Sequence, residues 1–298
     1  MHLLMVLAAI LGGFVFRCCY DRTERPGYRE RWYAALTQLV FPSVLLVTTT
    51  LAVVCMGNQG QMVWPDVIWT FGDRSVETLS YGISSIFLAM AAVRLAARSF
   101  GVWRSVRSIR RYPQHQILSH SCRVFDHDVP FSAVVGFWTP ELTIGRGLLE
   151  TLNEDQLNAV LAHERGHLHY RDTFWFFWLG WLKRLTPWLP KTEAIWQELL
   201  LLREIRADRW AAQQVDELLL AESLLKVASA PSVRHFNRSF EAADDFQAAL
   251  SCDAPRSRLE ERIDALLDET PPIPTWQLCL CKWLAVALVP LSIVPFHY

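Results

Sequence analysis

The residues most able to do chemistry form one short motif, His163-Glu164-Arg165-Gly166-His167. On a helix that turns about 100° per residue, His163 and His167 lie only about 40° apart, so both imidazoles can reach one ion. Glu164 lies about 60° further round, where it can take a proton from water held by that ion. Because catalytic zinc keeps three protein ligands and leaves a fourth position to water, a third ligand must come from elsewhere in the chain.

A second helix is predicted to supply that ligand. Thr192 is a suitable N-cap, and residues 193–214 contain neither Gly nor Pro. Glu204 and Asp208 stand one turn apart on this helix, so Glu204 can complete the ligand set while Asp208 accepts the free ring N–H of a ligand imidazole. The alternative is a solvated helix face on which these carboxylates pair with neighbouring arginines, namely Arg203, Arg206 and Arg209.

The surroundings of the motif also indicate a defined helix. Asn153 and Gln156 have the spacing of a capping box at its start. Asp172 follows His167 by five residues and is a further candidate for orienting an imidazole, although a role at a helix end is equally compatible. Gly166 costs about 1 kcal/mol of helix propensity relative to Ala, which close approach of a neighbouring backbone would explain.

The composition favours a membrane protein. Apolar residues make up 52% of the 298 residues, 13 of which are Trp. The net charge of −1 gives no reason to expect direct nucleic-acid binding. The 7 Cys form neither a zinc-finger nor a disulfide pattern, so we expect them to be apolar fillers in a reducing compartment.

Four apolar segments predict transmembrane helices. Residues 33–56 carry no formal charge and suffice to cross a hydrocarbon core of about 30 Å, and residues 78–97 are interrupted only by Arg94. A third segment covers residues 276–298. Residues 3–16 are shorter and lack the basic leader and cleavage site of a signal peptide, so we expect a retained membrane helix.

Arginine clusters orient these segments. Arginines gather between segments 3–16 and 33–56 and again from Arg94 to Arg111, whereas Arg74 is the single basic residue between segments 33–56 and 78–97. The positive-inside rule therefore predicts an outside amino terminus and a cytoplasmic region over residues 99–275. The aromatic stretch Thr173–Leu182 ends after ten residues, too short to cross, so it is expected to lie in the domain core or at the lipid interface.

Short strands are expected ahead of the motif, at Val134–Trp138 and Leu142–Ile144. An edge strand beside a metal can hold an extended peptide by main-chain hydrogen bonds. Val134, Val135 and Gly136 are accordingly candidate substrate-binding residues. Strands that only pack the core are an equally good interpretation.

Three stretches resemble a known group: SAVVGFWTPELTIGRGLLETLNEDQLNAV (132–160), AVLAHERGHLHYRD (159–172) and REIRAD (203–208). The chain resembles integral-membrane zinc peptidases of the gluzincin type, most closely the BlaR/MecR-type signal transducers and more distantly prenyl-protein endopeptidases and the heat-shock membrane protease. The resemblance implies one Zn²⁺ per chain on His163, His167 and Glu204, with Glu164 as base. It also implies a mainly α membrane protein of the bacterial cytoplasmic membrane, with four transmembrane helices and a cytoplasmic α+β zincin-like domain.

The function expected from these features is a membrane-bound endopeptidase that uses metal-activated water, with a protein or peptide substrate and with membrane lipid as its surroundings. The alternative is a signal transducer whose proteolysis of a transcriptional repressor, or of itself, relays a signal sensed by another protein. An inactive scaffold is disfavoured because Glu164 is intact. BlaR/MecR-type transducers continue into an extracellular sensor, and none follows Tyr298, so beta-lactam sensing by this polypeptide is not expected.

The donor that stabilises the oxyanion is open at this stage. His235 is the candidate we carry forward. Arg234, Tyr170 and Arg258 are alternatives.

Overall fold

The computed structural model describes most of the chain and divides it into two compact units. The first unit takes residues 1–96, 181–197 and 276–298, and the second takes residues 97–180 and 198–275. The residues that the structure describes are 2–19, 27–57, 63–64, 67–68, 74–126, 128–229, 256–267 and 279–296.

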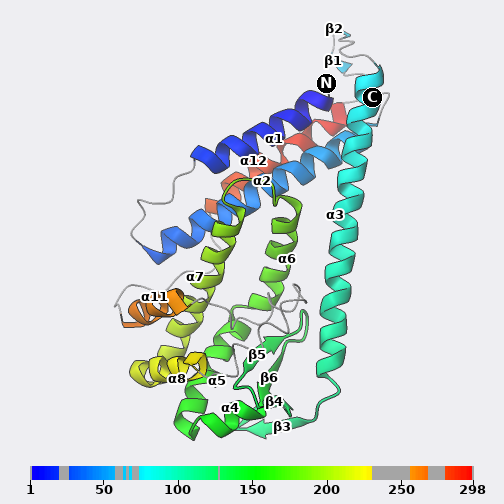
Figure 1. Ribbon diagram of the computed structural model, residues 1–298. Helices are drawn as coiled ribbons and strands as arrows, with labels where there is room; N and C mark the ends of the chain where they lie inside the picture. Colours follow the sequence, from blue (N-terminus) through cyan, green and yellow to red (C-terminus); the bar gives the residue numbers. More distant parts are fainter. Residues whose placement is uncertain are drawn as a thin grey trace. The chain divides into compact units, whose positions relative to one another are not determined.

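The first unit is built around the helix α2 (Tyr28–Met56), against which α1 (His2–Cys19) and α12 (Cys279–Ser292) pack (Figure 1). The most apolar window of α2 is 67% buried, against 28% for α1. A Cβ on Gly13 would lie 3.2 Å from Cβ of Pro42, so the glycine lets α1 approach α2 closely. The unit also contains the short antiparallel pair β1 (Val63–Trp64) and β2 (Val67–Ile68), and the turn η1 (Val294–Phe296).

Within the described residues, three helices are long and apolar enough to cross a membrane: α1, α2 and α3 (Arg74–Ile109). The predicted segment 78–97 lies within α3, which continues for 12 further residues because nothing breaks the helix before Pro113. The chain is thus mainly helical, with three candidate spans and a small mixed sheet. A fourth span stays a prediction, since α12 is described over 14 residues only.

The second unit holds a four-stranded mixed sheet in the order β3-β4-β6-β5. β3 (Gln114–Ile117) and β4 (His120–Phe125) are antiparallel, β4 and β6 (Glu141–Gly145) are parallel, and β5 (Ser132–Val135) is antiparallel to β6. β5 is therefore an edge strand.

Helices surround this sheet and form the core with it. α4 (Arg146–Thr151) leads into α5 (Glu154–His169), whose apolar side packs on β4, β5 and β6 through buried residues that include Val134, Leu142, Ile144, Val160 and Leu161. α8 (Glu217–Ser229) packs on α5, and α11 (Arg256–Leu267) packs on α8. The predicted capping box is confirmed, because the side chain of Asn153 accepts from Gln156 N while Gln156 returns the bond to Asn153 N.

Three of the described helices are shared between the units. α3, α6 (Asp172–Leu185) and α7 (Thr192–Ala212) each have one part in either unit. α6 contains the aromatic stretch 173–182 and is too short to be a candidate span among the described helices, as expected. In the first unit, the hydroxyl of Ser43 lies 3.0 Å from that of Thr186, in the loop between α6 and α7.

Candidate metal centre and catalytic residues

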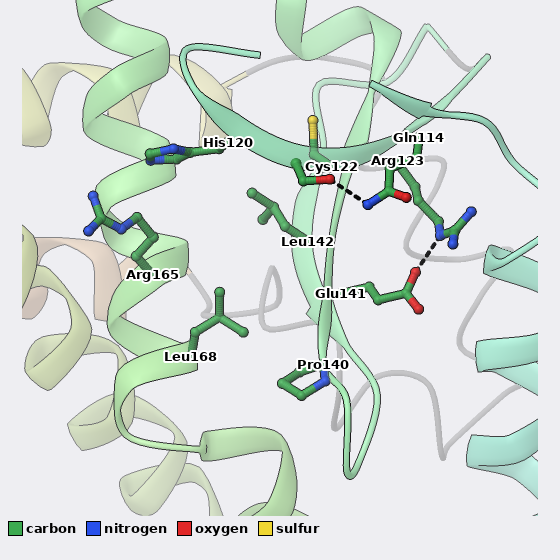
Figure 2. A pocket seen from close by; sticks show the side chains of 10 residues that line it. Gln114, His120, Cys122, Arg123, Pro140, Glu141, Leu142, Arg165 and Leu168 are labelled. Carbon is green, nitrogen blue, oxygen red and sulfur yellow. Dashed lines mark hydrogen bonds and ion pairs between the residues drawn. The ribbon is translucent and has the colours of Figure 1, made fainter. Parts of the chain in front are cut away.

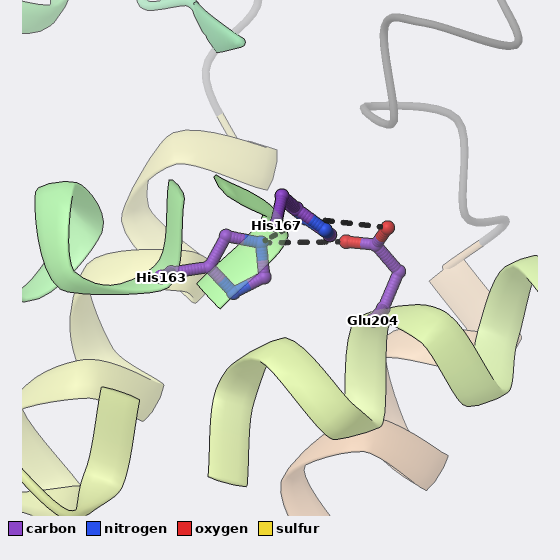
Figure 3. A group of neighbouring side chains, drawn as sticks. All are labelled: His163, His167 and Glu204. Atoms are coloured by element: carbon purple, nitrogen blue, oxygen red, sulfur yellow. Dashed lines mark hydrogen bonds and ion pairs between the residues drawn. The ribbon is translucent and has the colours of Figure 1, made fainter. Parts of the chain in front are cut away.

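Three buried side chains of the second unit converge on one point (Figure 3). His163 and His167 lie one turn apart on α5, and Glu204 comes from α7. The two imidazole Nε2 atoms are 3.1 Å apart, and the Glu204 carboxylate lies 3.4 Å from His163 Nε2 and 3.7 Å from His167 Nε2. Two imidazoles and a carboxylate with their donor atoms within 4.8 Å of one another fit the three protein ligands of a catalytic zinc.

The far side of each imidazole contacts its own carboxylate. His163 Nδ1 lies 2.7 Å from Asp208 Oδ1, and His167 Nδ1 lies 2.7 Å from Asp172 Oδ2. A carboxylate at Nδ1 fixes the orientation of the ring and leaves Nε2 available as a ligand. The structure thus brings Asp208 and Asp172 to the positions proposed from sequence.

An arginine is paired with each of the three carboxylates. Arg262 of α11 binds Asp208 through two contacts of 2.8 Å, and Arg203 lies 2.9 Å from Glu204. The third pair joins Arg206 to Asp172. All three guanidinium groups are buried. The sequence alternative, carboxylates paired with arginines on α7, is therefore partly right about Arg203 but wrong about solvation, because this part of α7 is in the core.

These charges set the ionisation of the site. Burial favours the neutral form of Glu204, but the charges of His167 and Arg203 prevail and hold its pKa well below the ordinary value. Burial likewise opposes protonation of His163, but Asp208 and Glu204 outweigh it and raise the imidazole pKa to about 10. Glu204 is thus ionised, and a metal must displace a proton from His163 as it binds.

Glu164 lies beside the ligands on α5 and has a hydrogen-bond donor of its own. Ser132, the first residue of β5, donates from Oγ to Glu164 Oε1 at 2.7 Å, and both side chains are buried. This bond orients the carboxylate. Ser132 was not predicted from sequence. Its place at the start of the strand flanking the motif is a signal that can be recognised afterwards.

Gly166 allows α5 and α7 to approach each other closely. A Cβ at this position would lie 3.0 Å from Cα and 3.1 Å from O of Ala207. The close backbone approach proposed to explain this glycine is therefore confirmed. It allows Glu204, three residues before Ala207, to reach the two imidazoles.

The candidate substrate-binding residues lie at the edge of the sheet, but one falls outside the strand. Val134 and Val135 are in β5 and pair with β6 on one side. The predicted strand over 134–138 is too long, because Gly136 adopts φ +127°, a conformation that other residues rarely take. β5 therefore ends at Val135, and the chain turns through Phe137–Thr139 into β6.

A separate pocket of about 500 Å³ lies on another side of α5 (Figure 2). Leu142, Leu168 and Pro140 line it together with Arg165, which lies about 200° round the helix from His163. An ion pair between Arg123 and Glu141 borders it. None of the metal ligands lines this pocket, so it is distinct from the metal centre.

The candidate oxyanion donors that the structure describes, Tyr170 and Arg258, contact other groups. His235 and Arg234 lie outside the described residues. Tyr170 stacks beneath the Arg206 guanidinium at 4.2 Å, and Arg258 lies 3.6 Å from Glu198. Sequence analysis missed Arg262, which is one turn beyond Arg258 on the same amphipathic helix and contacts Asp208 instead.

Comparison with known proteins bears on this geometry. The model of Peptidase family M48 matches residues 118–268, which include the whole sheet apart from β3, both ligand helices and α11. A protein named Protease HtpX homolog, from Aeropyrum pernix, is 34% identical over 134 residues, which cover 44% of this chain and 41% of that protein. The chain thus spans less than half the length of this relative. The match, which extends over half of the chain and contains His163, His167 and Glu204, shows that the chain belongs to peptidase family M48.

Proposed function

We propose that this protein is a membrane-bound, zinc-dependent endopeptidase that hydrolyses peptide bonds of a protein substrate. The observation that carries the proposal is the convergence of His163, His167 and Glu204, with the Glu164 carboxylate next to them and oriented by Ser132. Membership of peptidase family M48 supports it.

The chemistry follows from the positions of these side chains. Bound zinc polarises a peptide carbonyl and makes water more acidic. Glu164 is the group that accepts the proton of the attacking water and returns it to the leaving amine nitrogen. Asp208 and Asp172 hold the two imidazoles in place throughout, and burial of the site excludes bulk water from these contacts.

The edge strand β5 provides a place for the substrate. No described strand pairs with the side of β5 that faces away from β6. An extended peptide can add to this edge by main-chain hydrogen bonds at Val134 and Val135, as proposed from sequence, with Gly136 at the end of the edge. Since Ser132 on the same strand contacts Glu164, such a peptide would lie next to the base.

The proposed arrangement in the membrane keeps the four predicted spans, with residues 276–298 as the fourth and residues 99–275 in the cytoplasm. The three candidate spans that precede the peptidase region support it. We place the protein in the cytoplasmic membrane of a prokaryote, with a bacterial source still a prediction. A reporter fused after Ser99 should register as cytoplasmic, and an external signal would reverse this topology.

The decisive experiment compares Glu164→Gln with the wild type, both purified in mild detergent. We expect the variant to keep about one zinc per chain and to lose cleavage of an unfolded protein substrate. Glu154→Gln, at the exposed first turn of the same helix, is the matched control and should cleave normally. Equal cleavage by wild type and Glu164→Gln would remove Glu164 from the mechanism.

A second candidate function is signal transduction of the BlaR/MecR type, in which cleavage of a repressor or of the chain itself relays a signal. It is favoured by the order of three apolar helices, a peptidase region and the apolar helix α12. Mapping of new protein termini in cells that carry wild type or Glu164→Gln would separate the two. Cuts confined to one DNA-binding repressor or to this chain support signalling, whereas cuts in many membrane proteins support general proteolysis.

A further inference from the structure

An aromatic cluster occupies the turn between β5 and β6 in the second unit. The ring of Phe137 lies 4.8 Å from that of Phe174 and 4.8 Å from that of Phe177, both on α6. Trp138 also contacts Phe174, at 5.8 Å, yet its side chain is 80% exposed. We call Phe137 and Trp138 the hairpin tip. A tryptophan held in place by packed aromatic rings and open on its outer side is suited to binding an apolar surface.

Arg98 of α3 contacts α6 at this cluster and so shows which part of α3 lies beside it. This residue directly follows the predicted span 78–97, and its buried guanidinium donates from Nε to Phe177 O at 3.0 Å and from Nη2 to Phe176 O at 3.3 Å. A Cβ on Gly180 would lie 2.6 Å from Arg98 Nη2, so this glycine makes room for the arginine. Because the hairpin tip packs on Phe177 itself, it lies close to the residue of α3 that directly follows the predicted span.

The part of α3 that follows Arg98 has the composition of a membrane–water interface. Phe100 is 60% exposed and Trp103 is 52% exposed, and the Arg107 guanidinium lies 5.2 Å from the Trp103 ring centroid. Tryptophan is enriched at the headgroup level of membranes, and arginines next to a span attract anionic lipids. The occupant that this surface fits is therefore a phospholipid bilayer.

We propose that the hairpin tip inserts into the lipid headgroup region and thereby places the edge strand β5 against the membrane surface. Trp138 is six residues after Ser132, which contacts Glu164, so the base lies within about 20 Å of the tip along an extended chain. This inference rests on the proposed function and gives it a substrate class. The bonds cut are those within about six residues of the membrane, in extended segments that flank a transmembrane helix.

Insertion is tested without any catalytic measurement. Trp138→Cys is made in a full-length background whose native cysteines are serine and whose zinc content matches wild type, and it is labelled with an environment-sensitive dye. In vesicles of phosphatidylcholine and phosphatidylglycerol, we expect a blue-shifted emission that spin-labelled lipid quenches severalfold more than the emission of the control Glu154→Cys. Equal quenching at the two positions would overturn the proposal.

Substrate selection is tested with Trp138→Ser, a change at an exposed position that spares the core. Cleavage of a membrane-anchored substrate, with its scissile bond about six residues from the span, should fall about tenfold, while cleavage of the same sequence as a soluble peptide stays unchanged. Leu218→Ser, at a 67% exposed apolar residue of α8, is the matched control and should alter neither.

The outcomes are distinguishable. Equal losses with both substrates would show that Trp138 supports the peptidase generally and would overturn the lipid role. Loss with the anchored substrate alone, but no lipid quenching at residue 138, would show that the tip binds the substrate protein, which also overturns it. If wild type cuts neither substrate, the proposed function fails while the quenching result still decides whether the tip inserts.

Discussion

The two histidine ligands are supported by the same chemistry from different parts of the chain. The His167 arm consists of His167, Asp172 and Arg206, and the His163 arm consists of His163, Asp208 and Arg262. In each arm an imidazole contacts a carboxylate, which in turn pairs with a buried guanidinium. The His167 arm is drawn from α5, the start of α6 and α7, whereas the His163 arm reaches α11, 54 residues beyond Asp208.

This difference shows how the centre is assembled. The His167 arm is complete once α5, α6 and α7 have packed together. The His163 arm is completed only when α11 docks on the other side, because Arg262 contacts Asp208 and lies 3.6 Å from Glu204 as well. Docking of α11 therefore helps to position the ligand Glu204 and also Asp208, the carboxylate that orients the ligand His163.

The largest effects are expected from removing the arginines. Arg262→Gln and Arg206→Gln each leave a buried carboxylate without its guanidinium partner, and breaking a buried pair in this way typically costs about 3 kcal/mol or more. Both variants should therefore unfold at clearly lower temperature than wild type in detergent with a chelator present. Adding zinc should recover part of the loss, because the ion supplies positive charge to the same cluster.

Arg258→Gln is the matched control for the His163 arm. Arg258 is on the same helix and also faces a carboxylate, Glu198, but this pair is 3.6 Å long and Arg258 is 24% exposed. Its removal should cost less than about 1 kcal/mol. If Arg262→Gln and Arg258→Gln unfolded alike, the His163 arm would not be the element that holds α11 to the metal centre.

Changing the carboxylates should weaken zinc binding as well as the fold, because each variant also leaves a buried arginine without its carboxylate partner. Asp208→Asn and Asp172→Asn keep the shape of each side chain but replace the charge that orients the imidazole, a change that typically costs 10- to 100-fold in metal affinity, about 1.4–2.7 kcal/mol. Competition with a chelating dye measures this loss. Comparable losses are expected because both contacts are 2.7 Å long, and a large loss in one variant alone would show that the arms are not equivalent.

The same comparison shows what the sequence could predict. The two histidine ligands and Asp172 could be predicted from the sequence. Helical spacing places His163 and His167 together, and Asp172 follows His167 by five residues. Glu204 and Asp208 could be named from their one-turn separation. Arg262 could not, because a pattern within one amphipathic helix does not indicate which of its arginines will face another element.

The end of strand β5 and the residues around Glu164 could not be predicted from the sequence either. The predicted strand 134–138 ignored the conformation of Gly136, whose φ of +127° ends β5 at Val135. Ser132 was noted only as part of a motif, since its bond to Glu164 depends on the packing of β5 against α5. The predicted donor His235 lies outside the described residues, so that prediction stays untested.

A smaller effect is expected at Gly166, where both arms depend on the approach of α5 to α7. Gly166→Ala would press a methyl group against the Ala207 backbone at about 3.0 Å, and overpacking of this kind costs about 1–3 kcal/mol. Zinc affinity should fall together with thermal stability, since both ligand helices shift. Gly82→Ala, at a helical site with nothing within 4 Å, is the control and should not destabilise. Unchanged zinc affinity in Gly166→Ala would separate helix spacing from ligand geometry.

The smallest effect is expected from a cluster that has the same carboxylate–guanidinium pairing as the arms but lies near the surface. Glu141 pairs with Arg123 and with Arg110, and its side chain is 25% exposed. Burial favours the neutral form of this carboxyl, but the two guanidinium groups prevail and lower its pKa. Because water and salt screen such pairs, the cluster should contribute about 1 kcal/mol or less, far below a buried arm.

The pH dependence gives this last prediction its sign. A carboxyl whose pKa is lower in the folded than in the unfolded chain stabilises the fold above its unfolded pKa, about 4.3, and this stabilisation is lost as the pH falls through the folded pKa. Glu141→Gln should therefore unfold at a slightly lower temperature than wild type at pH 7. The unfolding temperatures of the two proteins should converge as the pH falls below about 4. High salt should likewise reduce the difference in unfolding temperature between the two proteins at pH 7. A gap at pH 7 as large as that of Arg262→Gln would mean that exposure does not separate the two clusters, and the contrast between buried and exposed pairs would fail.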